Sequence, residues 1–366
     1  AAPRRRAARG LAAVARDVPE VDISALRSPD ATAAERLTVG RQIDAAFRSA
    51  GFMYVSGHGV DPALTHGVRN AAAAFFDLPQ AEKDKILLTP ETACRGYQPL
   101  RMNVTQGVAD KHEGIDFYRD VRDDAVIEVD GVKVREAAAV AKELVGVNQW
   151  PEDIPSIADA LADTGGFRPV YEDYLNAMEG VGSDIMAGVS LGLGRDERFF
   201  EKYYDRAFWV MRVLRYPLAP PAVGDQQGVG EHTDYGCLTL ITADNAPGFD
   251  RCLQIRDMHK NDWVFVEPRD NCFIINIGDM LSHWVEGYRS TPHRVLSPQG
   301  HPDMPEAQAA RGRVSVAYFF EPNFDAVITP LAAAEGAGRG SGEPVLYGEH
   351  LREKVTSNFN YGVAQG

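Results

Sequence analysis

The sequence has few cysteines, and they show no pairing pattern. Only four occur in 366 residues, namely Cys94, Cys237, Cys252 and Cys272, and no two of them form a CxxC motif. Thiols spaced in this way fit a reduced protein better than a disulfide framework. A chain of this length can bury a core large enough to need neither disulfides nor a structural metal for stability.

Long apolar runs and an excess of positive charge are also missing. No stretch reaches the about 18 consecutive apolar residues that cross a bilayer. The formal net charge is −14, from 38 basic and 52 acidic residues, so the surface repels nucleic-acid phosphates and anionic lipids. We therefore expect neither a nucleic acid nor a membrane as a partner.

Positive charge is concentrated in residues 1–17, which are rich in arginine. We interpret this segment as a disordered basic tail, and the alternative is the remnant of an organellar transit peptide. The apolar segment of a secretory signal is missing, so we expect a cytoplasmic location, with organellar targeting left open. The sequence also contains no internal repeat, and we expect a monomer.

The periodicity of apolar residues predicts helices in the first half of the chain and strands in the second. Apolar residues at three- and four-residue steps predict helices at residues 34–50, 62–76 and 166–192. Short apolar runs between turns predict strands at residues 18–23, 51–55, 210–216, 237–242, 253–256, 263–266, 272–277, 293–296 and 314–320. Many short strands with regular turns indicate an α+β, mainly β, protein with a sandwich or jelly-roll core, flanking helices and one long support helix.

We divide the chain where this pattern changes. Residues 18–205 form an N-terminal region of helices and strands, residues 206–330 form the jelly-roll catalytic core, and residues 331–366 are expected to pack on that core. Residues 90–155 have few clean periodicities, and a long irregular segment is typical of a lid or a binding loop. All of these parts are expected to form one catalytic unit.

The tripeptide HTD places His232 and Asp234 two residues apart. On an extended backbone both side chains point to the same face, so an imidazole and a carboxylate can reach one ion. An HxD pair alone arises easily by chance, but His293, in STPHRV, lies on a predicted strand downstream and supplies a third ligand. Two histidines and one carboxylate leave open positions on an octahedral ion, which is the arrangement used for non-haem Fe(II). The sequence therefore predicts an iron site at these three residues.

A second candidate site begins at Arg313. Strand alternation places Arg313 and Ser315 on the same face. A buried guanidinium needs a partner, because an unpaired buried charge is costly. An internal salt bridge is one alternative, but an iron site on the same barrel favours a carboxylate co-substrate held by two parallel hydrogen bonds. Arg311 lies two residues earlier, and the alternation with Ser315 favours Arg313.

These motifs resemble those of the Fe(II)/2-oxoglutarate-dependent oxygenases of the isopenicillin N synthase-like group. The similarity covers most of the chain and is most specific in HTD, NIGDML, STPHRV, RVS and YFFEPN. The resemblance implies a double-stranded β-helix (a jelly roll), Fe(II) at the three residues above, and 2-oxoglutarate and O₂ as co-substrates, with ascorbate as a candidate stimulant. It also implies that Arg313, Ser315 and Tyr216 hold the far carboxylate of 2-oxoglutarate.

Several segments, among them MRVLRYP and HTDYG, resemble bacterial ethylene-forming enzymes. This resemblance implies that Arg212 lies near the co-substrate. The substrate side is less similar, because Asn103 precedes Val104 and Thr105 where those enzymes have a glutamate. The difference argues against L-arginine as the substrate.

The function implied is oxidation of a small-molecule metabolite, with release of succinate and CO₂. Hydroxylation is the default reaction, while desaturation or cyclisation needs only a different placement of the substrate. The alternatives are an iron oxidase that does not use 2-oxoglutarate and an enzyme of the ethylene-forming type. We expect no catalytic residue beyond the iron ligands, and Arg101 and Arg212 indicate an acidic group on the substrate. The candidate substrate contacts are Tyr235, Arg101, Asn103, Thr105, Phe117 and Phe319.

Overall fold

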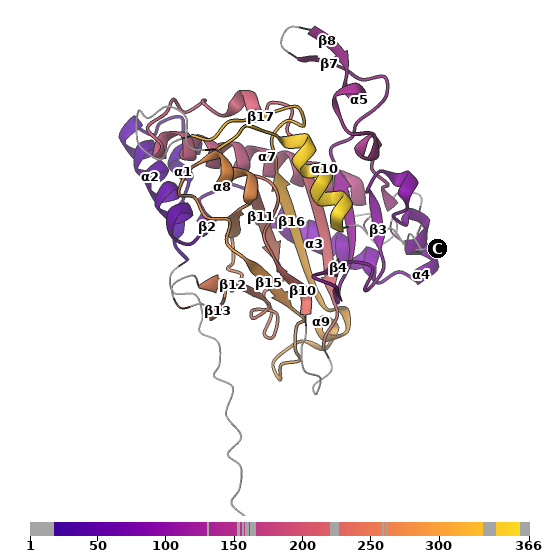
Figure 1. The fold of residues 1–366 in the computed structure, drawn as a ribbon. Coiled ribbons are helices and arrows are strands. Elements are labelled where there is room, and N and C mark those ends of the chain that lie inside the picture. The colour runs from indigo at the N-terminus through magenta and orange to yellow at the C-terminus, as the bar shows by residue number, and fades with distance from the viewer. Residues whose placement is uncertain are drawn as a thin grey trace, which may run out of the picture.

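The computed structural model describes residues 18–129, 132–151, 154, 155, 157, 161, 166–219, 227–257, 260, 262–331 and 342–358. The predicted basic tail, residues 1–17, lies outside the described residues. Two β-sheets form the centre of the molecule, with helices packed around them (Figure 1). In the described part of the chain, no helix combines the length and the apolar character needed to cross a bilayer.

The major sheet has eight strands in the order β1-β2-β14-β11-β16-β9-β6-β3. In that order they are Glu20–Asp22, Phe52–Ser56, Phe273–Ile277, Leu238–Ala243, Arg313–Phe320, Val210–Tyr216, Glu113–Tyr118 and Gly96–Gln98. The minor sheet has four strands in the order β10-β15-β12-β13, which are Gln227–His232, His293–Leu296, Leu253–Asp257 and Asp262–Phe265. The two sheets form the predicted double-stranded β-helix, and the strands predicted between residues 210 and 320 are all present, within one residue at each end.

The major sheet also uses strands from outside residues 206–330. β2 pairs with β14, and β6 pairs with β9, so the N-terminal region supplies strands on both sides of the catalytic strands. Strands β3 and β6 lie within residues 90–155, which the sequence favoured as a lid, so part of this segment belongs to the sheet. Another part of the segment forms the projecting hairpin of β7 (Val126–Val129) and β8 (Val132–Arg135), at the top of Figure 1.

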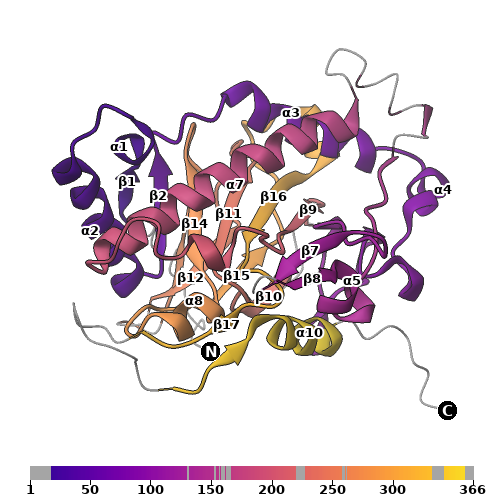
Figure 2. The ribbon, with the colours of Figure 1, turned by 90° about the horizontal axis from the view of Figure 1, so that it is seen from above.

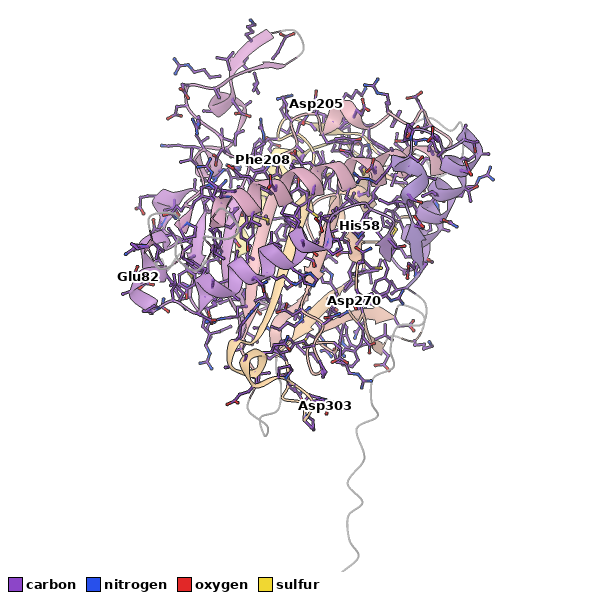
Figure 3. All side chains as sticks on the ribbon, turned by 180° about the vertical axis from the view of Figure 1, so that it is seen from behind. His58, Glu82, Asp205, Phe208, Asp270 and Asp303 are labelled. Atoms are coloured by element: carbon purple, nitrogen blue, oxygen red, sulfur yellow. The ribbon has the colours of Figure 1, made fainter. Side chains whose placement is uncertain are left out.

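Helix α7 (Phe167–Gly192) crosses the major sheet, as Figure 2 shows from above and Figure 3 from behind. Its apolar face is buried, and Gly182 allows it to approach β16, because a Cβ at Gly182 would lie 2.3 Å from the Phe320 ring. Helix α2 (Ala33–Ser49) packs on α7 where Gly40 meets the backbone, and a Cβ at Gly40 would lie 2.7 Å from the carbonyl oxygen of Gly188. Close backbone approach at these glycines brings the helices into one layer over the sheet.

The predicted helix at residues 62–76 is α3 (Pro62–Phe76), which contacts β9, β16 and α7. Asp61 caps its first turn by accepting a hydrogen bond from the Ala63 N–H, and Pro62 occupies the first helical position. The other α-helices in the described residues are α1 (Ser24–Arg27), α4 (Gln80–Lys83), α5 (Glu136–Ala139), α8 (Asp279–Trp284), α9 (Glu306–Arg311) and α10 (Tyr347–Asn358). The remaining strand pairs are β4 (Val104–Thr105) with β5 (Val108–Ala109), and β17 (Val327–Ile328) with β18 (Val345–Leu346).

Candidate metal centre and substrate cavity

The predicted iron ligands come together beside the minor sheet. β10 ends at His232 and β15 begins at His293, and their antiparallel register places the two histidines opposite each other, with ring centroids 4.3 Å apart. Asp234 Oδ1 lies 3.6 Å from His232 Nε2 and 3.7 Å from His293 Nε2. One possible ligand atom from each residue lies within 4.8 Å of the other two. This arrangement fits three ligands on one face of a single ion.

Each histidine is oriented by a backbone carbonyl. His232 Nδ1 lies 2.9 Å from the carbonyl oxygen of Gly230, and His293 Nδ1 lies 3.1 Å from that of Thr291. A carbonyl oxygen only accepts, so Nδ1 carries the proton in both rings and Nε2 carries the lone pair. Burial and the neighbouring His232 lower the pKa of His293 to about 4, which leaves its Nε2 free for a metal.

The Asp234 carboxylate is oriented by two side chains. Its Oδ2 accepts hydrogen bonds from the Thr239 hydroxyl and, at 2.6 Å, from Asn276 Nδ2, so Oδ1 is the oxygen that faces the histidines. Burial acts to raise the pKa of Asp234, but the two histidines and these hydrogen bonds lower it overall. A carboxylate beside two imidazoles is a donor set suited to a divalent cation such as Fe(II).

The predicted 2-oxoglutarate contacts lie at the opposite end of β9 and β16 from Val210 and Phe319. Arg313 is in register with Tyr216, and its guanidinium carbon lies 5.6 Å from the tyrosine ring centroid. Arg313 is 2% exposed, its Nε has no hydrogen-bond partner, and no described residue forms an ion pair with it. Ser315 is buried on the same strand. A buried guanidinium without a carboxylate is costly, so this position fits a carboxylate ligand that none of the described residues supplies.

A cavity of about 410 Å³ borders His232 and Asp234. Its walls come from β4 and the loop after it, from β6, β9, β10 and β16, and from helix α10, which lies in front of the barrel in Figure 1. A cavity of this size suits a small molecule. The predicted substrate contacts Asn103, Thr105, Tyr235 and Phe319 all line this cavity.

The other two predicted substrate contacts do not line the cavity. Strand alternation on β6 turns Asp116 and Tyr118 toward the cavity, while Phe117 is fully buried on the opposite face. The Phe117 ring stacks on Trp150, with ring centroids 4.4 Å apart. Arg101 is exposed outside the cavity. Phe117 and Arg101 therefore lie away from this cavity, and their contact with the substrate stays a prediction.

The structure separates Arg212 from the other predicted co-substrate residues. Arg212 lines the cavity and precedes Tyr216 on β9 by four residues, which is roughly 13 Å along a strand. Its Nε donates to Asp116 Oδ1 at 2.9 Å, and its Nη2 donates to Asn103 Oδ1 at 3.4 Å. Burial acts to lower the pKa of Arg212, but Asp116 raises it overall, so the guanidinium stays charged. Arg212 therefore lines the cavity that borders His232 and Asp234, and its contact with the co-substrate stays a prediction.

Sequence reasoning missed five charged residues of the cavity wall, namely Asp110, Asp116, Glu231, Glu321 and Lys354. Glu231 directly precedes the first ligand, on a strand that the sequence did not predict. Glu321 belongs to the YFFEPN motif, and it accepts a hydrogen bond from the Cys237 N–H at 3.0 Å. Burial raises its pKa to about 8. Lys354 comes from α10 and pairs with Asp279 Oδ2 at 3.1 Å.

Two family models match the chain. Residues 18–153 match the N-terminal region of the non-haem dioxygenases in morphine synthesis, and residues 208–322 match the 2OG-Fe(II) oxygenase superfamily. The second match contains all three candidate ligands and the Arg313 strand.

Known proteins similar to this chain include enzymes of plants and fungi. A homoarginine-6-hydroxylase of Glycine max is 36% identical and aligns with 93% of this chain and 97% of its own length. A homoarginine-6-hydroxylase of Oryza sativa subsp. japonica is 37% identical over 88% of this chain and 90% of its own. The crystal structure of a full-length Neurospora crassa protein in complex with α-ketoglutarate (2-oxoglutarate) and thymine superposes with a TM-score of 0.73, at 26% identity, and covers 95% of this chain and 99% of that one.

These similarities extend over nearly the whole chain and agree with the donor set and the buried Arg313. They do not support the alternative of an iron oxidase that works without 2-oxoglutarate. The chain belongs to the 2OG-Fe(II) oxygenase superfamily and is a 2-oxoglutarate-dependent dioxygenase.

Proposed function

We propose that this enzyme hydroxylates a small amino-acid-like molecule with a cationic side chain. The observation that carries the proposal is the carboxylate of Glu231 in the wall of a cavity that borders two of the candidate iron ligands. Among the described residues, no ion pair of the Glu231 side chain is present. A cationic substrate group would supply the missing countercharge. The relatives named homoarginine-6-hydroxylases support the same class, since homoarginine carries a guanidinium group.

In this proposal, His232, Asp234 and His293 hold Fe(II), and Arg313, Ser315 and Tyr216 hold the far carboxylate of 2-oxoglutarate. When bound, the metal and co-substrate supply the oxidation: O₂ is consumed, 2-oxoglutarate becomes succinate and CO₂, and the second oxygen atom enters a substrate C–H bond. The chain's own residues position the substrate and limit the access of water. Phe319 and Val229 give the cavity apolar surface, and Tyr235 lies beside Asp234.

The acidic group expected on the substrate fits the same molecule, because an amino acid also carries a carboxylate. Arg212 and Lys354 are the cationic side chains of the cavity wall and are the candidates to hold it. The wall thus offers both signs of charge to a zwitterionic ligand.

The test is a succinate assay with Fe(II), 2-oxoglutarate and a matched panel of homoarginine, arginine, lysine and thymine. We expect a cationic amino acid to raise succinate formation well above the rate without substrate, and mass spectrometry to find one added oxygen atom in that amino acid. The His232→Ala variant is the control and should give neither product. Stimulation by thymine alone would refute the proposed substrate class.

Measuring the gas phase in the same assay tests the ethylene-forming alternative. Hydroxylation predicts one succinate for each hydroxylated substrate and no ethylene. Ethylene released at a rate comparable to that of succinate would replace hydroxylation as the main reaction. Loss of two hydrogens from the substrate, in place of a gained oxygen, would indicate desaturation.

A further inference from the structure

A chain of polar contacts runs behind the cavity wall and involves a histidine that has no part in the metal site. His112 is 1% exposed, and its Nε2 lies 3.2 Å from Asn103 Nδ2. Asn103 Oδ1 in turn lies 3.4 Å from Arg212 Nη2, and Arg212 Nε donates to Asp116. Asn103, Arg212 and Asp116 all line the cavity, whereas His112 lies behind them.

The protonation state of His112 follows from its second contact. His112 Nδ1 lies 3.0 Å from the carbonyl oxygen of Gly228, which only accepts, so Nδ1 carries a proton and donates. Burial, followed by the charge of Arg212, lowers the pKa of His112 to about 4, although the Gly228 carbonyl, Asp110 and Asp116 act in the opposite direction. The imidazole is therefore neutral near pH 7, and Nε2 is an acceptor.

An acceptor at Nε2 settles which way the Asn103 amide points. The NH₂ group must face His112, and the carbonyl oxygen must face Arg212 and the cavity. A histidine protonated on Nε2 would require the reverse orientation, which would turn an NH₂ group toward the Arg212 guanidinium. Neutral His112 and the Arg212 guanidinium thus favour the same one of two amide orientations of nearly equal shape.

The loop that carries Asn103 does not depend on His112 for its position. Asp110 accepts hydrogen bonds from the Thr105 hydroxyl at 2.7 Å and from the Gly230 N–H at 3.1 Å, and its own N–H donates to the Asn103 carbonyl oxygen at 2.9 Å. These bonds anchor the loop to β10 directly. What His112 adds is the orientation of one side-chain amide.

We propose that His112 is a positioning residue for substrate recognition, which holds Asn103 with its carbonyl oxygen toward the cavity as an acceptor for an N–H group of the substrate. The identity of that substrate rests on the proposed function, whereas the orientation of the amide does not. Asn103 is a neutral side chain, and an amide acts as a selective acceptor only if it is held in one orientation.

The first test needs no substrate. The enzyme is labelled with ¹⁵N-histidine, and the His112 signals are identified as those lost in His112→Asn. We expect a protonated Nδ1 and an unprotonated Nε2 at pH 7. In Asn103→Asp, a carboxylate would face the imidazole, and we expect both ring nitrogens to be protonated. A wild-type signal of the opposite tautomer would overturn the proposal, because Asn103 would then present its NH₂ group to the cavity.

The second test uses two variants, each of which keeps one of the two His112 contacts, with Asn103 or with Gly228. In His112→Gln, the side-chain carbonyl can still accept from Asn103, while the contact with Gly228 is lost. In His112→Asn, the side-chain NH₂ can still donate to Gly228, while the acceptor for Asn103 is lost. The probe is homoarginine, and the measurements are its KM, the KM for 2-oxoglutarate and the melting temperature.

We expect His112→Asn to raise the KM for homoarginine about tenfold, which corresponds to about 1.4 kcal/mol, with the KM for 2-oxoglutarate unchanged. His112→Gln should keep the KM for homoarginine within about twofold of the wild type but lower the melting temperature. If both variants raise KM in proportion to their loss of melting temperature, His112 is only structural and the proposal fails. If homoarginine is not turned over by the wild type, the proposed function fails, and the tautomer measurement still decides the role of His112.

Discussion

The buried guanidinium of Arg313 leads to opposite predictions for the stability of the protein and for its affinity for 2-oxoglutarate. Arg313→Met removes a cation that is 2% exposed and that forms no ion pair with any described residue. Without 2-oxoglutarate this change should stabilise the protein, because replacing buried charges by apolar groups of similar volume often gains roughly 1–4 kcal/mol. With 2-oxoglutarate the same change should weaken binding severely, because the far carboxylate loses its partner.

The size of the binding loss can be estimated from the contacts expected. Two charge-assisted hydrogen bonds, each worth about 1.5–3 kcal/mol, give a loss of roughly 3–6 kcal/mol. That range corresponds to an increase in Kd of roughly 10²- to 10⁴-fold. The stability gain should appear as a rise of at least about 2 °C in the melting temperature of the metal-free protein.

Arg311→Met is the matched control. Arg311 lies two residues before Arg313, at the end of helix α9. Its Nη2 is 3.5 Å from both the Arg69 carbonyl oxygen and Asn70 Oδ1. The assay is an anaerobic titration of the Fe(II) protein with 2-oxoglutarate, which follows the metal-to-ligand charge-transfer band. Binding by Arg313→Met within threefold of the wild type would refute the assignment, and so would a comparable loss in Arg311→Met.

Three further predictions concern the ligands, the pH dependence and the cavity wall. Thr239→Val should weaken Fe(II) binding by roughly 10- to 100-fold in an equilibrium titration, since it frees the Asp234 carboxylate; unchanged affinity would exclude an orienting role for the hydroxyl. Burial raises the pKa of Glu321 to about 8 in the folded state, so the neutral form is favoured and stability falls as pH rises from about 4.5 to 8. Glu321→Gln should remove this slope in urea unfolding of the metal-free protein, and an unchanged slope would contradict the assignment. Phe117→Leu should lower the melting temperature and leave the substrate KM unchanged, whereas Phe319→Leu should change KM more than stability, and the reverse pattern would contradict their placement.

The metal centre could be predicted because its geometry is local in the sequence. Two ligands are separated by one residue, at the end of β10 and just after it, and the third begins a strand with a recognisable motif, which pairs with β10 and so lies opposite His232. Strand alternation placed Arg313 and Ser315 on one face of β16. For the pair His232 and Asp234 and for the pair Arg313 and Ser315, the constraint acts within a few residues. The sequence alone therefore shows which side chains share a face.

The cavity wall depends on contacts between distant segments, and there the sequence was insufficient. Strand β6 was not predicted, because both of its faces carry a charged residue. Glu113 lies on the core face, where its Oε2 forms an ion pair with Lys83 Nζ at 2.8 Å, and Asp116 lies on the cavity face. The charges hide the alternation, so the face on which Phe117 lies could not be assigned. The Gly-rich strand β10 was missed for lack of apolar residues. Helix α10 reaches Tyr235 through tertiary packing, which no local pattern specifies.

The strand order of the major sheet has a consequence for synthesis on the ribosome. Helix α7 ends at Gly192, but the strands that cover its apolar face, β11 and β16, are completed only at residue 320. At a synthesis rate of about 5–20 residues per second, the apolar face of α7 stays uncovered by these strands for on the order of ten seconds. Strand β2 ends at Ser56, and its partner β14 is complete only at Ile277, so its interval is longer still. The yield of soluble protein should therefore depend on translation speed and chaperone supply during that interval more than on the stability of the finished fold.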